Sequence, residues 1–162
     1  MRVWDQRPVE IRNLFNPAFC GLVLYRAMAA YEIEDERGLP FSLAPLVLPI
    51  CLHKPSREIL AQGTRSYFLK LVATHPQLLV GFGARAHDML PFTFEALGLL
   101  HQLGTVQVRP DGRLKSHAQG VRKTITGSDE TQAIQKVAKF LGKEFARIGD
   151  RVTIYTTMGV RP

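Results

Sequence analysis

Cysteine is scarce in this 162-residue chain, and acidic residues are fewer than basic ones. Cys20 and Cys51 lie in apolar stretches that predict inert, buried thiols, and two cysteines cannot form the disulfide framework of a small secreted domain. The longest uncharged run, residues 38–53, contains three prolines and is shorter than the roughly 20 residues that a membrane-spanning helix needs. The N-terminal residues carry charges in place of the apolar core of a signal peptide. These absences predict a cytoplasmic protein with no membrane contact.

Sequence motifs for catalysis are missing as well. No glycine-rich loop ends in Gly-Lys-Ser/Thr, so we do not expect the chain to hydrolyse nucleotides alone. The run GFGARA at residues 81–86 resembles a dinucleotide-binding turn, but no βαβ pattern surrounds it, which favours close helix packing instead. Cys51 and His53 lie two residues apart without the second ligand pair of a zinc site. We therefore predict no catalytic residue, no cofactor and no metal; an enzyme with a dispersed site around His53 or His87 is an alternative that no residue spacing supports.

Helix signals dominate a composition that is typical of a globular chain, with 46% apolar and 22% charged residues. Asn16 followed by Pro17 predicts a helix start, and apolar residues at spacings of three and four extend that helix to about residue 33. Residues 41–52 are almost all apolar and are expected in the core, where Pro49 would break or kink a helix. Ser128 is expected to cap a C-terminal helix with an apolar stripe. Further helices are predicted at residues 8–15, 55–63, 65–75, 76–89 and 91–103.

A β-hairpin is predicted next, because the turn Pro-Asp-Gly at residues 110–112 separates an alternating strand at 105–109 from a returning strand at 113–115. Three helices followed by a hairpin is the order of a winged helix-turn-helix unit, with the hairpin as the wing. A closing strand is expected at residues 151–155. The predicted fold is α+β, mainly α with a small β hairpin, in a single domain over residues 1–162. Its parts are a helical N-terminal part (1–63), a winged-helix-like part (64–127) and a C-terminal helix and strand (128–162).

The net charge of +7 is distributed unevenly. Residues 1–50 carry five basic and six acidic side chains, whereas residues 51–162 carry sixteen and eight. The helix before the hairpin contains Glu95 and no lysine or arginine, which argues against reading base edges in a major groove. The acidic run at residues 32–36 is expected to be a solvated helix end. Candidates for contact with a phosphate backbone are the cations of the hairpin and the loop after it, namely Arg109, Arg113, Lys115, Arg122 and Lys123.

Several short pieces of sequence recur in a familiar order along nearly the whole chain. They are Trp4 with RPVE at residues 7–10, NLFNPAFC at 13–20, LVLP at 46–49, LHKP at 52–55, GF at 81–82 leading into RA at 85–86, DGRL at 111–114, FLGK at 140–143 and MGVRP at 158–162. Through these pieces the chain resembles the middle component of bacterial three-component ABC systems, the family that includes the small subunit of Lamassu-type defence complexes.

That resemblance implies a non-catalytic accessory subunit. It would bridge an SMC- or Rad50-like ABC ATPase and an effector, often a nuclease, in a complex that acts against phage or plasmid DNA and contacts DNA through the assembly. The alternative from the residues themselves is a stand-alone winged-helix transcriptional regulator. That protein would form dimers and bind DNA with strong salt dependence, with Arg109, Arg113 and Lys115 on phosphates.

The N-terminal stretch is the predicted partner-binding element, because tryptophan and arginine are enriched at interface hot spots. The alternative is that Trp4 packs over the core of its own chain. The residues proposed for this contact are Trp4, Arg7, Pro8, Asn13 and Asn16.

We predict that Trp4→Ala leaves folding intact and weakens complex formation, because it removes an aromatic anchor from the interface. Circular dichroism reports the fold, and co-purification with the products of adjacent genes reports the complex. A variant that fails to fold would reject the interface role.

Overall fold

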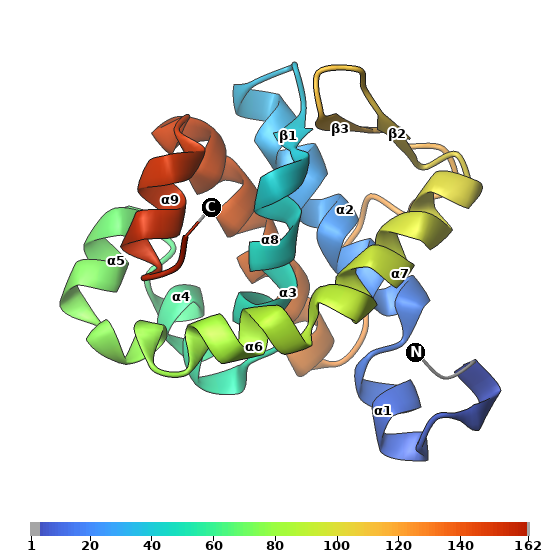
Figure 1. Cartoon of the computed structure of the whole chain (residues 1–162), viewed down its shortest axis with the longest axis horizontal. Coiled ribbons are helices and arrows are strands. Elements are labelled where there is room, and N and C mark those ends of the chain that lie inside the picture. Colours follow the sequence, from blue (N-terminus) through green and yellow to red (C-terminus); the bar gives the residue numbers. More distant parts are fainter. Residues whose placement is uncertain (1–3, 162) are drawn as a thin grey trace.

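Helices make up most of residues 4–161, the part of the chain that this computed structural model describes, and a small antiparallel sheet lies at one edge (Figure 1). The predicted class, mainly α with a small β hairpin, is therefore confirmed. Within this part of the chain, no helix is long and apolar enough to cross a membrane. In chain order the α-helices and the short 3-10 helices (η) are η1 (Trp4–Gln6), α1 (Val9–Leu14), α2 (Pro17–Glu34), η2 (Phe41–Leu43), α3 (Ala44–Cys51), α4 (Lys54–Gln62), α5 (Phe68–Thr74), η3 (Pro76–Leu79), α6 (Phe82–Asp88), α7 (Leu90–Gln102), α8 (Asp129–Ile148) and α9 (Arg151–Thr157).

Helix α2 runs through the centre of the molecule and packs along α8 (Figure 1). Both helices begin where the sequence predicts: the Asn16 side chain accepts hydrogen bonds from the amides of the first turn of α2, and Ser128 accepts one from Thr131. Every residue from Cys20 to Tyr31 is buried or half-buried. A helix that is apolar around most of its circumference must be covered on all sides, and the buried hydrophobic cluster takes side chains from every helix from α2 to α9.

Helix α3 confirms the core position predicted for the apolar segment, since seven of its eight residues are buried. Of the break or kink expected at Pro49, the break does not occur, because α3 continues past Pro49 to Cys51. Proline removes one backbone donor and crowds the preceding turn. Here the burial of the leucines and isoleucine around it, Leu46, Leu48 and Ile50, offsets that loss.

Two predicted helices are shorter than expected. The helix predicted at residues 65–75 begins only at Phe68, whose amide donates to the buried carboxylate of Glu144 at 2.8 Å. The helix predicted at residues 76–89 is divided into η3 and α6 by Gly81, which has a positive φ of 66°. A left-handed residue interrupts the α-helical hydrogen-bond pattern, and glycine adopts that conformation without strain.

The closing strand predicted at residues 151–155 is wrong, because this segment forms helix α9. Asp150 caps the helix by accepting hydrogen bonds from the amides of Val152 and Thr153 at 3.2 and 3.0 Å. Ile154 and Met158, four residues apart, are buried on the same face. The valine, threonine and isoleucine that suggested a strand have only a weak intrinsic preference, which capping and burial override.

The sheet contains one strand more than predicted. Its strands are β1 (Leu39–Pro40), β2 (Val106–Val108) and β3 (Arg113–Ser116), in the order β1-β3-β2 with both pairs antiparallel. The hairpin of β2 and β3 is confirmed, and Leu114 pairs with Val108 on one side and Leu39 on the other. β1 contains Pro40, which sheets accept at an edge. The winged helix-turn-helix assignment of this region stays a prediction.

We predict that Gly142→Ala lowers the free energy of unfolding by about 3 kcal/mol or more, because overpacking at a backbone contact leaves nothing flexible to move. A Cβ at Gly142 would overlap the carbonyl oxygen of Ala27 and lie 2.8 Å from its carbonyl carbon. Urea denaturation measures the change. The control is Gly98→Ala in α7, where an added Cβ has no neighbour within 4 Å and helix propensity predicts a gain of about 0.5–1 kcal/mol. Equal stability of the two variants would contradict the close crossing of α2 and α8.

Candidate functional site

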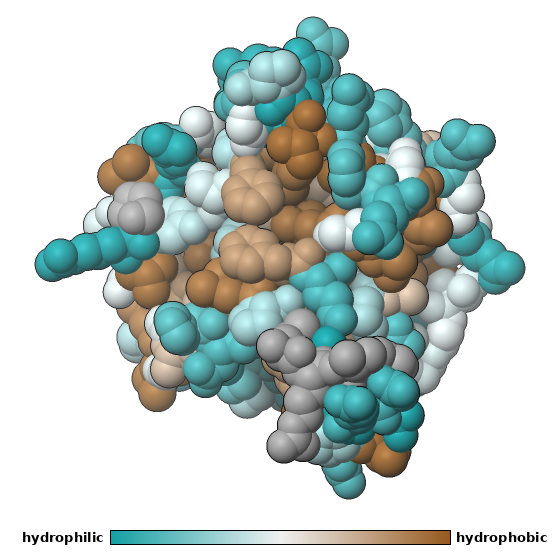
Figure 2. Space-filling view, turned by 45° about the vertical axis from the view of Figure 1, so that its right-hand side comes forward, coloured by the Kyte–Doolittle hydropathy of each residue, from teal (hydrophilic) through white to brown (hydrophobic). Residues whose placement is uncertain are grey.

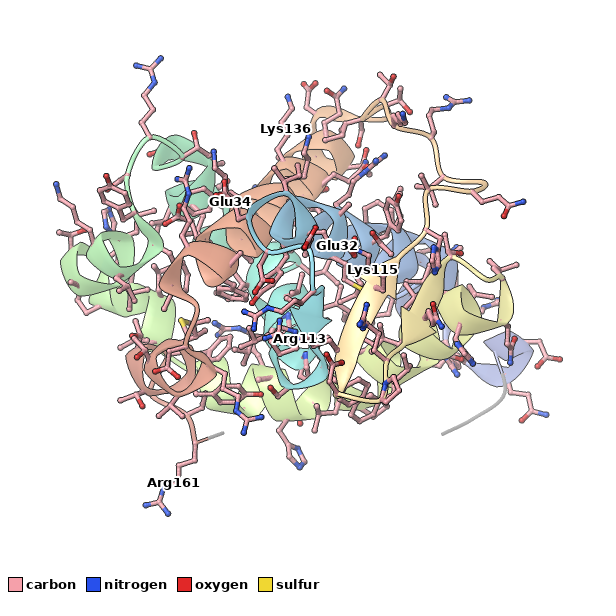
Figure 3. The ribbon with its side chains drawn as sticks, turned by 90° about the horizontal axis from the view of Figure 1, so that it is seen from above. Glu32, Glu34, Arg113, Lys115, Lys136 and Arg161 are labelled. Carbon is pink, nitrogen blue, oxygen red and sulfur yellow. The ribbon has the colours of Figure 1, made fainter. Side chains whose placement is uncertain are left out.

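The cations of strand β3 are engaged by carboxylates at the end of α2 (Figure 3). Lys115 Nζ lies 3.0 Å from Glu32 Oε2, and Glu32 also accepts a hydrogen bond of 2.6 Å from the Ser116 amide. Arg113 lies 3.6 Å from Asp35 and donates at 2.7 Å to the carbonyl oxygen of Gly38. These contacts attach the hairpin to α2 across about eighty residues of sequence.

The acidic run is therefore not a purely solvated helix end, and that expectation is wrong for two of its members. The side chains of Glu32 and Asp35 are mostly buried against the hairpin. Hydrogen bonds from the Arg37 side chain hold the pKa of Asp35 at about 2, and the charge of Arg113 adds to the effect. The remaining predicted cation of the hairpin, Arg109, lies 3.9 Å from Asp111 within the turn.

A cavity of about 660 Å³ opens on the other side of the hairpin, between α2, the end of α7 and the loop of residues 117–128. Its walls are largely apolar, with Leu22 from α2, Leu99 and Leu103 from the end of α7 and Val121 from the loop. An apolar cavity with a few convergent polar groups is typical of a ligand site. This cavity is the candidate site.

Arg26 supplies the main polar group of the cavity. Its side chain is 6% exposed, and burial lowers its pKa. The guanidinium donates to Gln135 Oε1 at 3.1 Å, to the carbonyl oxygen of Arg122 at 2.6 Å and to that of Lys123 at 3.3 Å. All three acceptors are neutral, so Arg26 fixes the loop without neutralising its own charge.

The loop itself has little regular structure and depends on side chains for its hydrogen bonds. Besides the two carbonyls that Arg26 binds, the carbonyl oxygen of Thr126 accepts from Gln135 and that of Gly127 from Gln132. Of the predicted residues, Arg122 thus lines the cavity and Lys123 contacts Arg26 through its carbonyl oxygen, while both side chains are exposed. Arg26 is not among the site residues predicted from the sequence. The available signal was that Arg26 is the one charged residue between residues 17 and 31.

The N-terminal segment lies against α7. The guanidinium of Arg7 is buried and makes two hydrogen bonds of 2.7 Å to the carboxylate of Glu95. Two parallel charge-assisted bonds of this kind fix both position and angle. The rings of Phe15 and Phe92 stack with centroids 4.5 Å apart. Glu95, which would have faced phosphates in a recognition helix, instead binds its own N-terminal segment.

The other residues proposed for partner contact have mixed environments. Pro8 and Asn13 are exposed, whereas the side chain of Asn16 caps α2. The side chain of Trp4 lies outside the described residues, and its contact with a partner stays a prediction.

The cysteines and histidines are dispersed in the fold. Cys20 and Cys51 are fully buried, as predicted, and burial raises the pKa of both thiols, that of Cys20 to about 12. Thiols with such values stay protonated and are poor nucleophiles. His53 shares a hydrogen bond of 2.8 Å with Ser56, and burial, followed by the charges of Arg85 and Arg57, lowers its pKa. Within residues 4–161, no group of three or more cysteine, histidine or acidic side chains is arranged to hold a metal ion.

The fold and the cavity define a mainly helical protein whose basic side chains join segments that are distant in sequence. The chain belongs to the family described as ABC-three component (ABC-3C) system Middle Component 3, whose model matches residues 4–162. The resemblance stated from the sequence is confirmed at this level, and its Lamassu-like detail stays a prediction. No curated protein and no solved structure matches the chain.

We predict that Asp35→Asn destabilises the fold at neutral pH and that the difference from wild type shrinks as the pH falls towards 2. A carboxyl whose pKa is about 2 in the fold, against an ordinary 3.8, stabilises the fold fully above its ordinary value and loses that contribution on acidification. Urea denaturation between pH 2 and 7 measures the difference. The control is Asp88→Asn, whose carboxylate is strongly exposed and is expected to change stability little at any pH. A constant difference for Asp35→Asn across this range would contradict the ionic attachment.

Proposed function

We propose that this chain is a non-catalytic accessory subunit that bridges an SMC- or Rad50-like ABC ATPase and an effector nuclease. The complex would be a cytoplasmic, Lamassu-like assembly of bacteria that acts against phage or plasmid DNA. The observation that carries the proposal is membership of the Middle Component 3 family over nearly the whole chain. A middle component requires at least one surface for each neighbour, and two exposed apolar surfaces are candidates.

The first surface is an aromatic pair formed by Phe41 and Phe94. Their rings are parallel within 3°, with centroids 6.0 Å apart, and the two residues are 40% and 46% exposed. The Phe41 amide donates to the carbonyl oxygen of Gly112, which fixes this residue beside the hairpin, while Phe94 projects from α7. Figure 2 shows hydrophobic side chains gathered on the face below the hairpin. Rigid aromatic groups of this kind are frequent interface anchors.

The second surface lies around α5 and η3, at one edge of the molecule (Figure 1, green). It contains four large exposed side chains, Tyr67, Leu69, Leu79 and Val80. α5 and η3 pack against each other, so these side chains belong to one region. Two separate apolar surfaces suit a subunit that holds two different partners.

The alternative of a stand-alone DNA-binding regulator requires Arg113 and Lys115 to contact phosphates. Both cations already contact carboxylates of the same chain, at Asp35 and Glu32. Each phosphate contact would have to replace an existing ion pair, which removes much of its free-energy gain. The accessory role requires no such exchange.

Co-expression with the products of adjacent genes, followed by affinity pull-down and gel filtration, tests the proposal. We expect a stable complex that contains a coiled-coil ABC ATPase. Phe94→Ala should weaken the attachment of one partner by about thirtyfold, equivalent to about 2 kcal/mol for a hot-spot aromatic. Tyr67→Ala should weaken attachment of the other partner.

Val152→Ala is the matched control, because Val152 is a half-exposed apolar residue that belongs to neither surface, and its replacement is expected to leave the complex intact. A chain that elutes alone as a dimer, with no neighbour attached, would overturn the accessory role. Release of the same partner by Phe94→Ala and Tyr67→Ala would contradict the assignment of one surface to each partner.

A further inference from the structure

The lining of the cavity between α2, α7 and the loop at residues 117–128 is electrostatically one-sided. It includes two arginines, Arg26 and Arg122, and no aspartate or glutamate. The sequence also has no acidic residue between Asp111 and Asp129, so the loop that forms one wall brings no carboxylate. A cavity with cations and no anion has a positive potential, which low-dielectric walls strengthen.

Arg26 has hydrogen-bonding capacity beyond its contacts within the chain. A guanidinium has five N–H donors, and the three hydrogen bonds of Arg26 each use one nitrogen. Each terminal nitrogen therefore has a second N–H that can donate to a carboxylate, sulfonate or phosphate.

No carboxylate of residues 4–161 lies within ion-pairing distance of Arg26. Arginine keeps its charge in proteins, and a buried charge is normally paired because its desolvation is costly. Among residues 4–161 the fold thus holds a buried cation beside a cavity without a carboxylate to neutralise it.

Size and wall chemistry define the rest of the ligand. A volume of about 660 Å³ lies within the range of roughly 300–1,000 Å³ that holds a small molecule. Leu22, Leu99 and Leu103 offer apolar contact, and Thr124 and Thr126 line the cavity on the loop side. A hydrated inorganic anion would leave these walls uncovered, whereas an organic anion would cover them.

We propose that this cavity binds a small organic anion, with its anionic group on Arg26 and its apolar body against the leucines of α2 and α7. The site is independent of the bridging role, because it needs only this chain. It gives the protein a ligand-binding function in addition to its attachment of partners.

A pair of fluorescent probes tests the proposal on the isolated chain. 8-Anilinonaphthalene-1-sulfonate has an apolar body and a negative charge, and N-phenyl-1-naphthylamine has nearly the same body without the charge. We expect the sulfonate probe to bind with a stoichiometry of one and at least about tenfold more tightly than the neutral probe. Arg26→Gln should remove that preference, because it keeps a polar side chain and deletes the charge.

A second pair of variants makes the test independent of the folding of Arg26→Gln. Leu103 lines the cavity and is 69% exposed, so its replacement does not disturb the core. Leu103→Glu and Leu103→Gln lose the same apolar contact and have the same shape, but only the glutamate supplies a carboxylate to the cavity, so Leu103→Glu should bind the sulfonate probe about tenfold more weakly than Leu103→Gln.

Three results would overturn the site. They are equal affinity for the two probes, binding of several sulfonate molecules per chain, and equal binding to Leu103→Glu and Leu103→Gln. A chain that forms the ABC-3C complex and gives any of these results retains the bridging role and loses the ligand site. A chain that binds the probe as expected and pulls down no partner retains the site and loses the bridging role.

Discussion

A backbone contact between α2 and α8, at Ala27 and Gly142, fixes the arrangement of the helices. Because α8 has no side chain at this point, the two helices approach closely and bury a long shared surface. That approach places Arg26, one residue before Ala27, opposite Gln135 of α8. The cavity wall, the loop at residues 117–128 and the hairpin that precedes it are all positioned relative to this helix pair.

Basic side chains then attach the segments that helix packing alone does not hold. Arg7 binds Glu95 and anchors the N-terminal segment to α7, while Arg26 anchors the loop. Arg57 donates to Glu130 at 2.6 Å and to the carbonyl oxygen of Cys51 at 3.0 Å, which joins α4 to α8 and α3. The contacts of Arg7 with Glu95, Arg26 with Arg122 and Arg57 with Glu130 span 88, 96 and 73 residues of sequence. The positive net charge of the chain is thus partly a set of internal connections, and a count of exposed cations overstates what is free for a partner.

Local signals in the sequence predicted the parts of the fold that depend on local physics. Asn16 and Ser128 cap helices because each needs only the amides of its own first turn. The segment that forms α3 was predicted to lie in the core because it has almost no polar side chain that could face water. Strand β1 was missed, because two residues form a strand only when β3 supplies the hydrogen-bonding partner. Helix α9 was read as a strand, because β-branched residues were given more weight than the cap at Asp150.

In the candidate site, too, local sequence predicted the residues but not their partners in distant segments. Arg113, Lys115, Arg122 and Lys123 were identified as a basic group from composition, but their partners lie in α2 and were not accessible from spacing along the chain. Arg26 was missed because its function depends on carbonyl groups almost a hundred residues away. A single charged residue in an otherwise apolar helix is the signal that would have identified it.

The central position of α2 also determines how the chain folds during synthesis. Helix α2 ends at Glu34 and its main packing partner begins at Asp129, so 95 residues of translation separate them. At the usual translation rate of 5–20 residues per second, synthesis of α8 begins about 5 to 20 seconds after α2 is complete. During that interval α3 and α7 can cover part of α2, but the face that α8 later covers stays exposed. The close approach of the helices at Gly142 is therefore among the last core contacts that the growing chain can form.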